Sequence, residues 1–164
     1  MKWKLLLFTL GSVSLVACGQ RSFDQKLEGM YQHTVPLIKP ATLDSLQQQH
    51  SVVLLDTRTP EEYAVSHLSN ARFVDYDGFE VSDVSDVDKD AEVVVYCAVG
   101  YRSERVGEAL QEAGYRHVRN LYGGIFAWKN DGREVVNRQG QPTDSVHTYN
   151  RNWSKWLKRG TKVW

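Results

Sequence analysis

Apolar runs alternate with amphipathic segments through residues 35–130. Three segments are predicted as buried strands: 51–56, 92–97 and 118–121. The first two are nearly continuous apolar runs, which are typical of strands buried on both faces of a parallel sheet. Residues 103–113 instead place apolar side chains three and four positions apart, and Gly114 marks the end of the helix that this spacing predicts. Strands that alternate with helices predict an α/β fold with helices on both faces of a parallel sheet.

Proline and capping residues indicate where other elements begin. Thr59, Pro60 and Glu62 have the spacing of a capping box with proline in the first helical position, so a helix is expected from Pro60. Pro36 and Pro40 restrict any strand over residues 35–39 to the edge of the sheet. The remaining expected elements are a helix over 42–48, a strand at 73–74 and a helical turn over 125–129.

Composition and charge narrow the classes of function. The 164 residues are 41% hydrophobic and 24% charged, which indicates one packed domain with appendages. Basic and acidic residues number 20 each, so no overall field attracts nucleic acid, and we expect no nucleic-acid partner. The two cysteines, Cys18 and Cys97, are too few for a disulfide framework or a four-cysteine zinc site, and we expect no metal.

The N-terminus has the features of a secretion signal. Two lysines precede an apolar run that is shorter than the roughly 20 residues of a membrane-spanning helix. The run ends in Leu15-Val16-Ala17-Cys18, which resembles the lipobox of bacterial lipoproteins. This resemblance implies removal of residues 1–17, lipidation of Cys18 and anchoring on the periplasmic side of the cell envelope. Gly19 favours the outer over the inner membrane by the same resemblance. An ordinary signal with a chance cysteine is the alternative.

The segment 96–103 carries the candidate chemistry. It joins a buried strand to a helix, and ligands of open parallel sheets bind at such strand ends. The free N–H groups and partial positive charge of a helix N-terminus stabilise a thiolate at Cys97. Gly100 lets the loop curl its N–H groups inward as an anion nest, and Arg102 adds a planar cation. The loop therefore predicts a nucleophilic sulfur in an anion-binding cradle, with an inert buried cysteine as the alternative.

The order of residues in this loop resembles the active loop of rhodanese-like sulfurtransferases. The loop is Cys97-Ala98-Val99-Gly100-Tyr101-Arg102-Ser103. Three further segments resemble family signatures in the family's order: Asp56-Thr57-Arg58 with Glu62, His67-Leu68-Ser69-Asn70-Ala71, and Leu121-Tyr122-Gly123-Gly124-Ile125-Phe126-Ala127-Trp128. The resemblance covers most of residues 35–130 and implies a rhodanese-like five-stranded parallel sheet flanked by helices on both faces. The expected divisions are a signal peptide (1–17), a lipidated tether (18–34), the rhodanese-like domain (35–130) and a C-terminal extension (131–164).

The same resemblance implies a sulfurtransferase. Cys97 would take a sulfane sulfur from a donor such as thiosulfate, and the resulting persulfide would pass it to cyanide or a thiol. The residues expected to bind the substrate are Ala98, Val99, Gly100, Tyr101, Arg102 and Ser103. No cofactor is required. The expected partners are the small donor and acceptor and, through the lipid on Cys18, the membrane; the protein is expected to be a monomer.

Several noted residues have structural interpretations. Asp56 and Arg58 are expected to hold neighbouring loops as a charge pair rather than to touch the substrate. His67 is expected to be a hydrogen-bonded structural residue, because a thiolate in an N–H nest needs no base. Trp128 is expected in the core. Arg105 either adds positive potential at the loop or is solvated, and the sequence does not decide between the two.

Two other functions compete with sulfur transfer. Cysteine phosphatases and arsenate reductases place five residues between cysteine and arginine, whereas four separate Cys97 from Arg102 here, and the smaller loop suits a single bound sulfur better. A non-catalytic binding module is the second alternative. The presence of Cys97 and Arg102 argues against that alternative.

Two charged segments have competing explanations. Residues 75–92 hold eight acidic residues and one lysine; without the ligand spacing of a calcium loop, they are expected to form a solvated connection whose valines face inward. The bases and tryptophans of 151–164 would suit a membrane surface. The spacing of Trp153, Trp156 and Leu157 favours instead a helix packed on the domain with its bases outward.

Overall fold

The computed structural model describes residues 23–164. The expected signal peptide, residues 1–17, and the lipidation site at Cys18 lie outside the described residues, so both stay predictions. Among the described residues no helix is long and apolar enough to cross a membrane.

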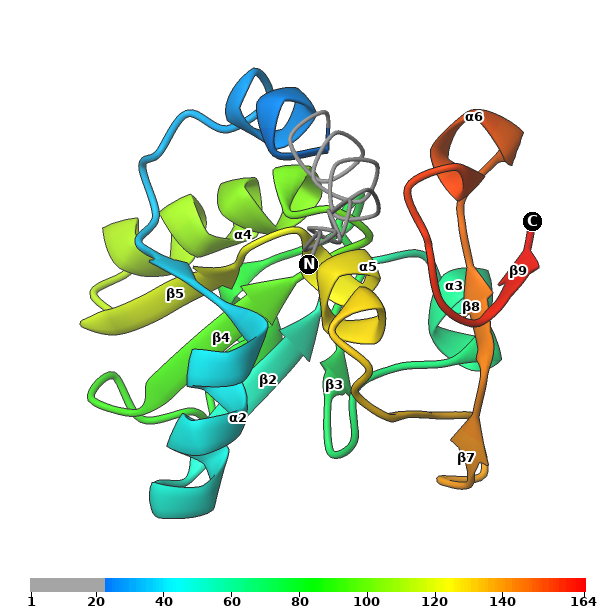
Figure 1. The fold of residues 1–164 in the computed structure, drawn as a ribbon. Helices are drawn as coiled ribbons and strands as arrows, with labels where there is room; N and C mark the ends of the chain where they lie inside the picture. Colours follow the sequence, from blue (N-terminus) through cyan, green and yellow to red (C-terminus); the bar gives the residue numbers. More distant parts are fainter. Residues whose placement is uncertain (1–22) are drawn as a thin grey trace, which may run out of the picture.

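A five-stranded sheet forms the centre of the fold, and all its strand pairs are parallel. Its strands, in spatial order, are β1 (Leu37–Ile38), β5 (His117–Leu121), β4 (Glu92–Tyr96), β2 (Val52–Asp56) and β3 (Arg72–Phe73). The predicted α/β fold is thus confirmed (Figure 1). The proline-limited strand β1 lies at one edge, as its sequence requires, because proline cannot donate to a central ladder.

The two central strands end level with each other. The register of β2 on β4 runs from Val52 opposite Glu92 to Asp56 opposite Tyr96. Beyond these ends the Thr57 amide donates a hydrogen bond of 2.9 Å to the Tyr96 carbonyl. The loops that follow β2 and β4 therefore leave the sheet side by side. They lie at the carboxyl ends of the strands, where parallel sheets bind ligands.

Helices cover both faces of the sheet. Helices α2 (Pro40–Gln49) and α5 (Gly124–Asn130) lie on one face and α4 (Tyr101–Glu112) on the other, whereas α3 (Pro60–Val65) follows β2 and lies beside the C-terminal extension. Leu43 of α2 and Phe126 of α5 belong to one apolar cluster, whereas Val106 and Leu110 of α4 belong to a second cluster. The capping box predicted at Thr59 is present at the start of α3, with both of its reciprocal hydrogen bonds.

The acidic segment 75–92 follows its predicted pattern. It contains a short 3-10 helix, η1 (Val81–Val84), whose Val84 is buried in the cluster beneath α4. Phe79 and Val87 pack partly buried against the same cluster. Val84 also accepts a hydrogen bond of 2.7 Å from the Tyr115 hydroxyl through its carbonyl. The segment is a solvated connection fixed by its apolar residues.

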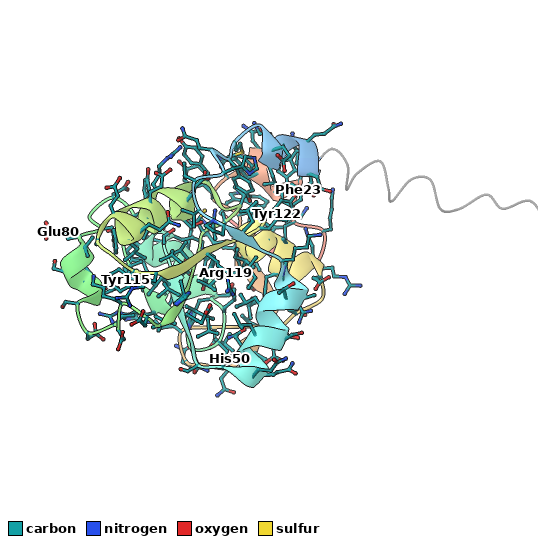
Figure 2. The ribbon with its side chains drawn as sticks, turned by 90° about the vertical axis from the view of Figure 1, so that its left-hand side faces the viewer. Phe23, His50, Glu80, Tyr115, Arg119 and Tyr122 are labelled. Atoms are coloured by element: carbon teal, nitrogen blue, oxygen red, sulfur yellow. The ribbon has the colours of Figure 1, made fainter. Side chains whose placement is uncertain are left out.

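The N-terminal segment is packed on the domain rather than extended from it. Residues 23–28 are helical, and Phe23, Leu27 and Tyr31 are buried in the larger apolar cluster. The Tyr122 hydroxyl donates a hydrogen bond of 2.8 Å to Asp24, and Figure 2 shows Phe23 and Tyr122 on the same side of the molecule. The described part of the expected tether is therefore a structural element, because its apolar residues find partners beside α5.

The C-terminal extension is also built into the domain. Its elements are β6 (Val135–Val136), β7 (Pro142–Thr143), β8 (Ser145–His147), α6 (Arg151–Ser154) and β9 (Thr161–Val163). Strands β8 and β9 pair in parallel, and β8 lies beside α3 (Figure 1). Leu157 is fully buried, and Trp153 and Trp156 pack partly buried against the core. The predicted packing is confirmed, but the helix is only four residues long and the strands are additional.

Candidate active site

Cys97 occupies the turn between the central strand β4 and helix α4. The strand ends at Tyr96, and Gly100 is the N-cap of the helix. The Cys97 side chain is 1% exposed, and its Sγ accepts a hydrogen bond of 3.1 Å from the Gly100 amide. The backbone of this loop thus directs an N–H group at the sulfur, in the manner of an anion-binding nest.

Gly100 is required at its position for two reasons. Its φ of +99° lies in the left-handed region that favours glycine. A Cβ at this residue would also meet the Tyr31 hydroxyl at 2.4 Å and the Tyr31 ring at 2.9 Å. The curl that turns the amide toward Cys97 therefore depends on a residue without a side chain.

Tyr31 supports the loop from the N-terminal segment. Its hydroxyl donates to the Val99 carbonyl at 2.6 Å and accepts from the Gly123 amide at 2.9 Å. Burial raises the pKa of Tyr31 far above its usual value, so the hydroxyl keeps the proton that it donates. Sequence reasoning missed Tyr31, because nothing in the local pattern links it to a loop 68 residues away.

Asn120 of β5 supports the other side of the loop. Its side-chain amide donates to the Gly100 carbonyl at 2.8 Å, and its side-chain oxygen accepts from the Ser103 hydroxyl at 2.8 Å. Ser103 is fully buried in this contact. Ser103 was expected to bind substrate, but its place in the first turn of α4 directs it toward β5, behind the loop.

Helix α5 fixes the carbonyl groups of the loop. The amide of Ile125 donates to the Cys97 carbonyl at 2.9 Å, and the amide of Phe126 donates to the Ala98 carbonyl at 3.2 Å. These bonds hold both carbonyls on the α5 side of the loop. Gly124 makes this approach possible, since a Cβ there would lie 2.2 Å from the Cys97 carbonyl oxygen.

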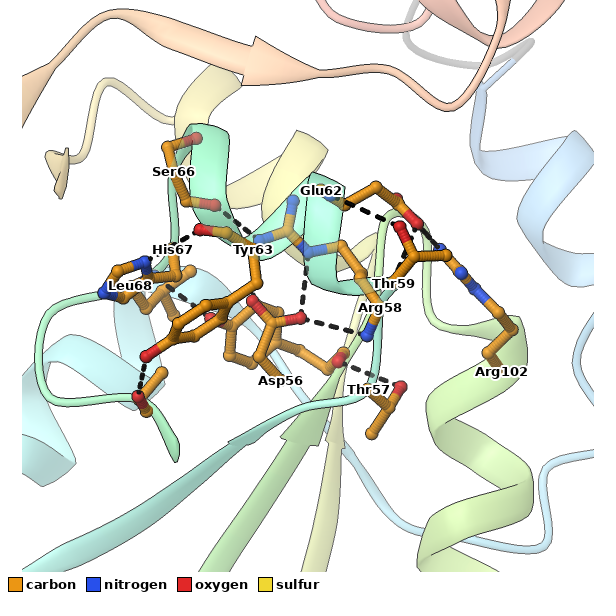
Figure 3. A network of polar contacts seen from close by, with 12 residues as sticks. Asp56, Thr57, Arg58, Thr59, Glu62, Tyr63, Ser66, His67, Leu68 and Arg102 are labelled. Carbon is orange, nitrogen blue, oxygen red and sulfur yellow. Dashed lines mark hydrogen bonds and ion pairs between the residues drawn. The ribbon is translucent and has the colours of Figure 1, made fainter. Parts of the chain in front are cut away.

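Arg102 forms an ion pair with Glu62 at the front of the loop. Its Nη2 lies 2.9 and 2.8 Å from the two carboxylate oxygens, and Figure 3 shows the pair joining α3 to α4. The Glu62 side chain is 1% exposed and that of Arg102 19%. Burial opposes the charge on Arg102, but the charges of Cys97 and Glu62 outweigh it and raise the pKa of Arg102. Arg102 therefore stays cationic beside the sulfur.

Asp56 and Arg58 form a buried ion pair behind the site. Arg58 Nε and Nη2 lie 2.9 and 2.6 Å from the two carboxylate oxygens of Asp56, and neither side chain is exposed. Arg58 Nη2 also donates to the Ser66 carbonyl at 2.5 Å, which ties the loop after β2 to the end of α3 (Figure 3). The pair holds loops together and does not line the pocket before Cys97.

His67 also does not line the pocket before Cys97. Its Nδ1 is 3.1 Å from the Tyr63 carbonyl oxygen, and its ring stacks on Tyr63 with centroids 3.9 Å apart. The backbone of His67 forms an antiparallel bridge with Val136 of β6. The ring is thus a packed, hydrogen-bonded group on Tyr63, and the backbone of His67 joins this segment to the C-terminal extension.

A pocket of about 350 Å³ opens in front of Cys97. The loop residues that line it are Cys97, Ala98, Val99, Tyr101 and Arg102. The other lining residues come from distant parts of the chain: Met30, Thr59, Tyr76, Asp77, Tyr149 and Trp153. Four of the six expected substrate-binding residues thus line the pocket, and Gly100 contributes its amide to the sulfur. Within residues 23–164 no group of three or more His, Cys, Asp or Glu side chains is arranged to hold a metal ion.

Arg102→Met is expected to lower the free energy of unfolding by about 2 kcal/mol. The substitution leaves the buried Glu62 carboxylate without its counter-charge. Because Arg102 is partly exposed, the loss of stability is smaller than that for breaking a fully buried ion pair. Adding Glu62→Gln should recover at least half of the loss. Urea denaturation measures both values.

Arg105→Met is the matched control, because Arg105 forms a more exposed pair with Glu108 on the same helix. It is expected to cost about 0.5 kcal/mol. Equal losses for Arg102→Met and Arg105→Met would contradict the interpretation of Glu62 and Arg102 as a stabilising pair.

The chain is similar in sequence to several known proteins. A sulfurtransferase of Allochromatium vinosum is 36% identical over 95 residues, which cover 58% of this chain and 88% of that protein. An uncharacterized protein of Synechocystis sp. is 31% identical over 105 residues, covering 64% of this chain and 58% of that protein. A tRNA uridine(34) hydroxylase of Erwinia tasmaniensis is 31% identical over 126 residues, covering 74% and 33%. The chain therefore spans less than two thirds of the last two relatives.

The chain is also similar to solved structures and matches a family model. A rhodanese-related protein from Thermoplasma volcanium superposes with a TM-score of 0.55 at 26% identity, over 62% of this chain and 97% of that one. The rhodanese-like domain of an Anabaena sp. protein superposes with a TM-score of 0.58 at 25% identity, over 62% and 79%. The model of the rhodanese-like domain matches residues 39–131, more than half of the chain. The chain belongs to the rhodanese-like family.

Proposed function

We propose that this protein is a sulfurtransferase that carries a sulfane sulfur on Cys97. The observation that carries the proposal is the Gly100 amide 3.1 Å from the Cys97 sulfur, in a loop that opens on a pocket. An N–H group placed there stabilises negative charge on sulfur. The relative from Allochromatium vinosum, which is matched over 88% of its length, bears the name sulfurtransferase, and this name supports the proposal.

The proposed cycle has two displacements at sulfur. The Cys97 thiolate attacks the outer sulfur of thiosulfate; the new S–S bond forms as the bond to the sulfonate sulfur breaks, and sulfite leaves with that electron pair. The product is an anionic persulfide, whose outer sulfur the loop amides can stabilise. A nucleophilic acceptor then attacks this outer sulfur, and the electron pair of the S–S bond returns to Cys97 as thiolate. Cyanide as acceptor gives thiocyanate.

The position of Arg102 favours this cycle over phosphate ester hydrolysis. A phosphatase arginine binds its oxyanion in two places, whereas one terminal nitrogen of Arg102 is already bonded to both oxygens of Glu62. The ion pair keeps a cation near the sulfur. Because Glu62 already occupies one terminal nitrogen of Arg102, the arginine is less available to bind a tetrahedral anion such as phosphate. Arg102 is thus proposed to act mainly by stabilising negative charge on the Cys97 sulfur, and to contribute less to binding the sulfur donor.

Intact mass of the purified protein tests the proposal. Incubation with thiosulfate is expected to add one sulfur atom to the chain, and subsequent cyanide should remove it. Cys97→Ser should add none, whereas Cys18→Ser, which leaves Cys97 as the only cysteine, should still load. The loss on Cys97→Ser is expected to be complete because a serine oxygen cannot form the persulfide.

Three results would overturn the proposal. Loading that persists in Cys97→Ser would place the sulfur elsewhere. Failure of reduced Cys97 to load from thiosulfate or from an organic persulfide would favour the binding-module alternative. Hydrolysis of an aryl phosphate that disappears in Cys97→Ser would instead favour a phosphatase.

A further inference from the structure

Part of the pocket wall lies outside the region that matches the family. The family match covers residues 39–131, yet Met30, Tyr149 and Trp153 line the pocket together with Cys97. Tyr149 and Trp153 belong to the C-terminal extension, which folds back beside α3. The extension therefore adds a surface to the front of the active loop that the family domain alone does not provide.

This added wall makes the pocket mainly apolar and aromatic. Tyr76 and Tyr101 also line it, and among the described residues that line it Asp77 and Arg102 carry charged side chains. The cation of Arg102 is paired with the carboxylate of Glu62. A volume of about 350 Å³ with this lining is typical of pockets that hold an organic molecule.

Tyr149 is held in a costly backbone conformation at the pocket. Its φ of +63° is in the left-handed region, which is uncommon for a bulky residue. Its amide donates to His147 Nδ1 at 3.1 Å, and the Arg102 guanidinium lies 5.8 Å from the centre of its ring. The ring nevertheless remains 56% exposed. Strain that places a half-open aromatic ring beside the active loop is typical of a ligand-binding position.

Trp153 is fixed more firmly than Tyr149. The Asn150 side-chain oxygen caps α6 by accepting from the amides of Asn152 and Trp153. The Trp153 side chain packs partly buried against the core, and Leu157 after it is fully buried. This wall is therefore largely formed before any ligand arrives, which lowers the entropic cost of binding.

We propose that the sulfur acceptor is an organic thiol with an aromatic or extended apolar body that packs on Tyr149 and Trp153. This inference rests on the proposed function. The sulfur of the acceptor thiol attacks the outer sulfur of the anionic persulfide at Cys97, and the proton of the thiol passes to that outer sulfur. A new S–S bond forms on the acceptor, the S–S bond to Cys97 breaks, and its electron pair leaves Cys97 as a thiolate. The acceptor departs as an organic hydropersulfide, so atoms, charge and electrons balance.

The test compares two thiol acceptors with the full-length protein. The readout is the ratio of kcat/KM for phenylmethanethiol to kcat/KM for 2-mercaptoethanol, with thiosulfate as donor. Tyr149→Asn, which tolerates the left-handed conformation but lacks the ring, and Trp153→Leu should each lower this ratio about tenfold. Tyr149→Phe should keep the wild-type ratio. An unchanged ratio in both Tyr149→Asn and Trp153→Leu would overturn the inference.

Trp164→Ala is the matched control. Trp164 lies in the same extension and is 56% exposed, as Tyr149 is, but it does not line the pocket. Its removal should leave the ratio unchanged. An equal fall for Trp164→Ala and Tyr149→Asn would mean that the extension acts only through its folding.

A binding measurement separates this inference from the proposed function. Phenylmethanesulfonate carries the same body and an anionic head but cannot accept sulfur, and calorimetry reports its affinity without turnover. If Cys97 takes up no sulfur, turnover is lost with both thiols, and this measurement still tests whether the pocket binds an aromatic ligand. Binding to wild type that weakens about tenfold in Tyr149→Asn supports the apolar-ligand pocket. Absence of binding, or equal binding by both proteins, overturns it.

Discussion

Gly124→Ala is expected to displace the active loop and to lower the free energy of unfolding by about 4 kcal/mol. The added Cβ would lie 2.2 Å from the Cys97 carbonyl oxygen and 2.7 Å from the Ala98 carbonyl. Both obstacles are backbone atoms, so no side-chain rotation relieves the contact. Withdrawal of α5 would break the hydrogen bonds from Ile125 and Phe126 that hold these carbonyls. Sulfur loading of Cys97 should fall with stability.

Gly114→Ala provides the control for backbone conformation. Gly114 has a φ of +89°, also in the left-handed region, but a Cβ there would meet nothing within 4 Å. Its replacement is expected to cost about 1 kcal/mol, from the conformation alone. Urea denaturation of the two variants therefore isolates the steric part. If Gly124→Ala lowers the free energy of unfolding no more than Gly114→Ala does, the loop at Cys97 moves to accommodate the added Cβ at little cost.

Elements with strong local signals could be predicted from the sequence. The apolar runs at 52–56 and 92–96 became the central strands because a strand buried on both faces needs apolar residues throughout. The capping residues fixed the start of α3 for a purely local reason. Gly100 and Arg102 identified the loop at Cys97 because both are close to it along the chain.

The supporting residues of the site could not be predicted, because their contacts span long distances along the chain. The residues of this kind are Tyr31, Asn120, Tyr149 and Trp153. Strands β8 and β9 have three residues each, too few for a clear alternation of polar and apolar positions. Val146 of β8 is fully buried on the domain, a tertiary contact that a local pattern does not contain. The contact between Ser103 and Asn120 could not be predicted for the same reason, since Asn120 lies on a separate strand.

Asp56→Asn is expected to lower the free energy of unfolding by about 4 kcal/mol. The Arg58 guanidinium would remain fully buried without its counter-charge. Burial opposes the charge on Arg58, but Asp56 outweighs it and raises the pKa of Arg58, so the arginine cannot escape the cost by losing its proton. The loss should extend to the Ser66 carbonyl, which accepts from the same guanidinium.

Two further variants identify the source of this loss. Asp56→Asn combined with Arg58→Met removes both charges, and its cost should be smaller than the sum of the two single costs because no buried charge is left alone. Arg72→Met breaks a pair with Asp86 whose side chains are 42% and 68% exposed, and it should cost about 0.5 kcal/mol at most. A double variant that costs the full sum would mean that Asp56 and Arg58 act independently. Since the pair joins the loops after β2 and α3, less than additive costs would assign it a structural role beneath the site.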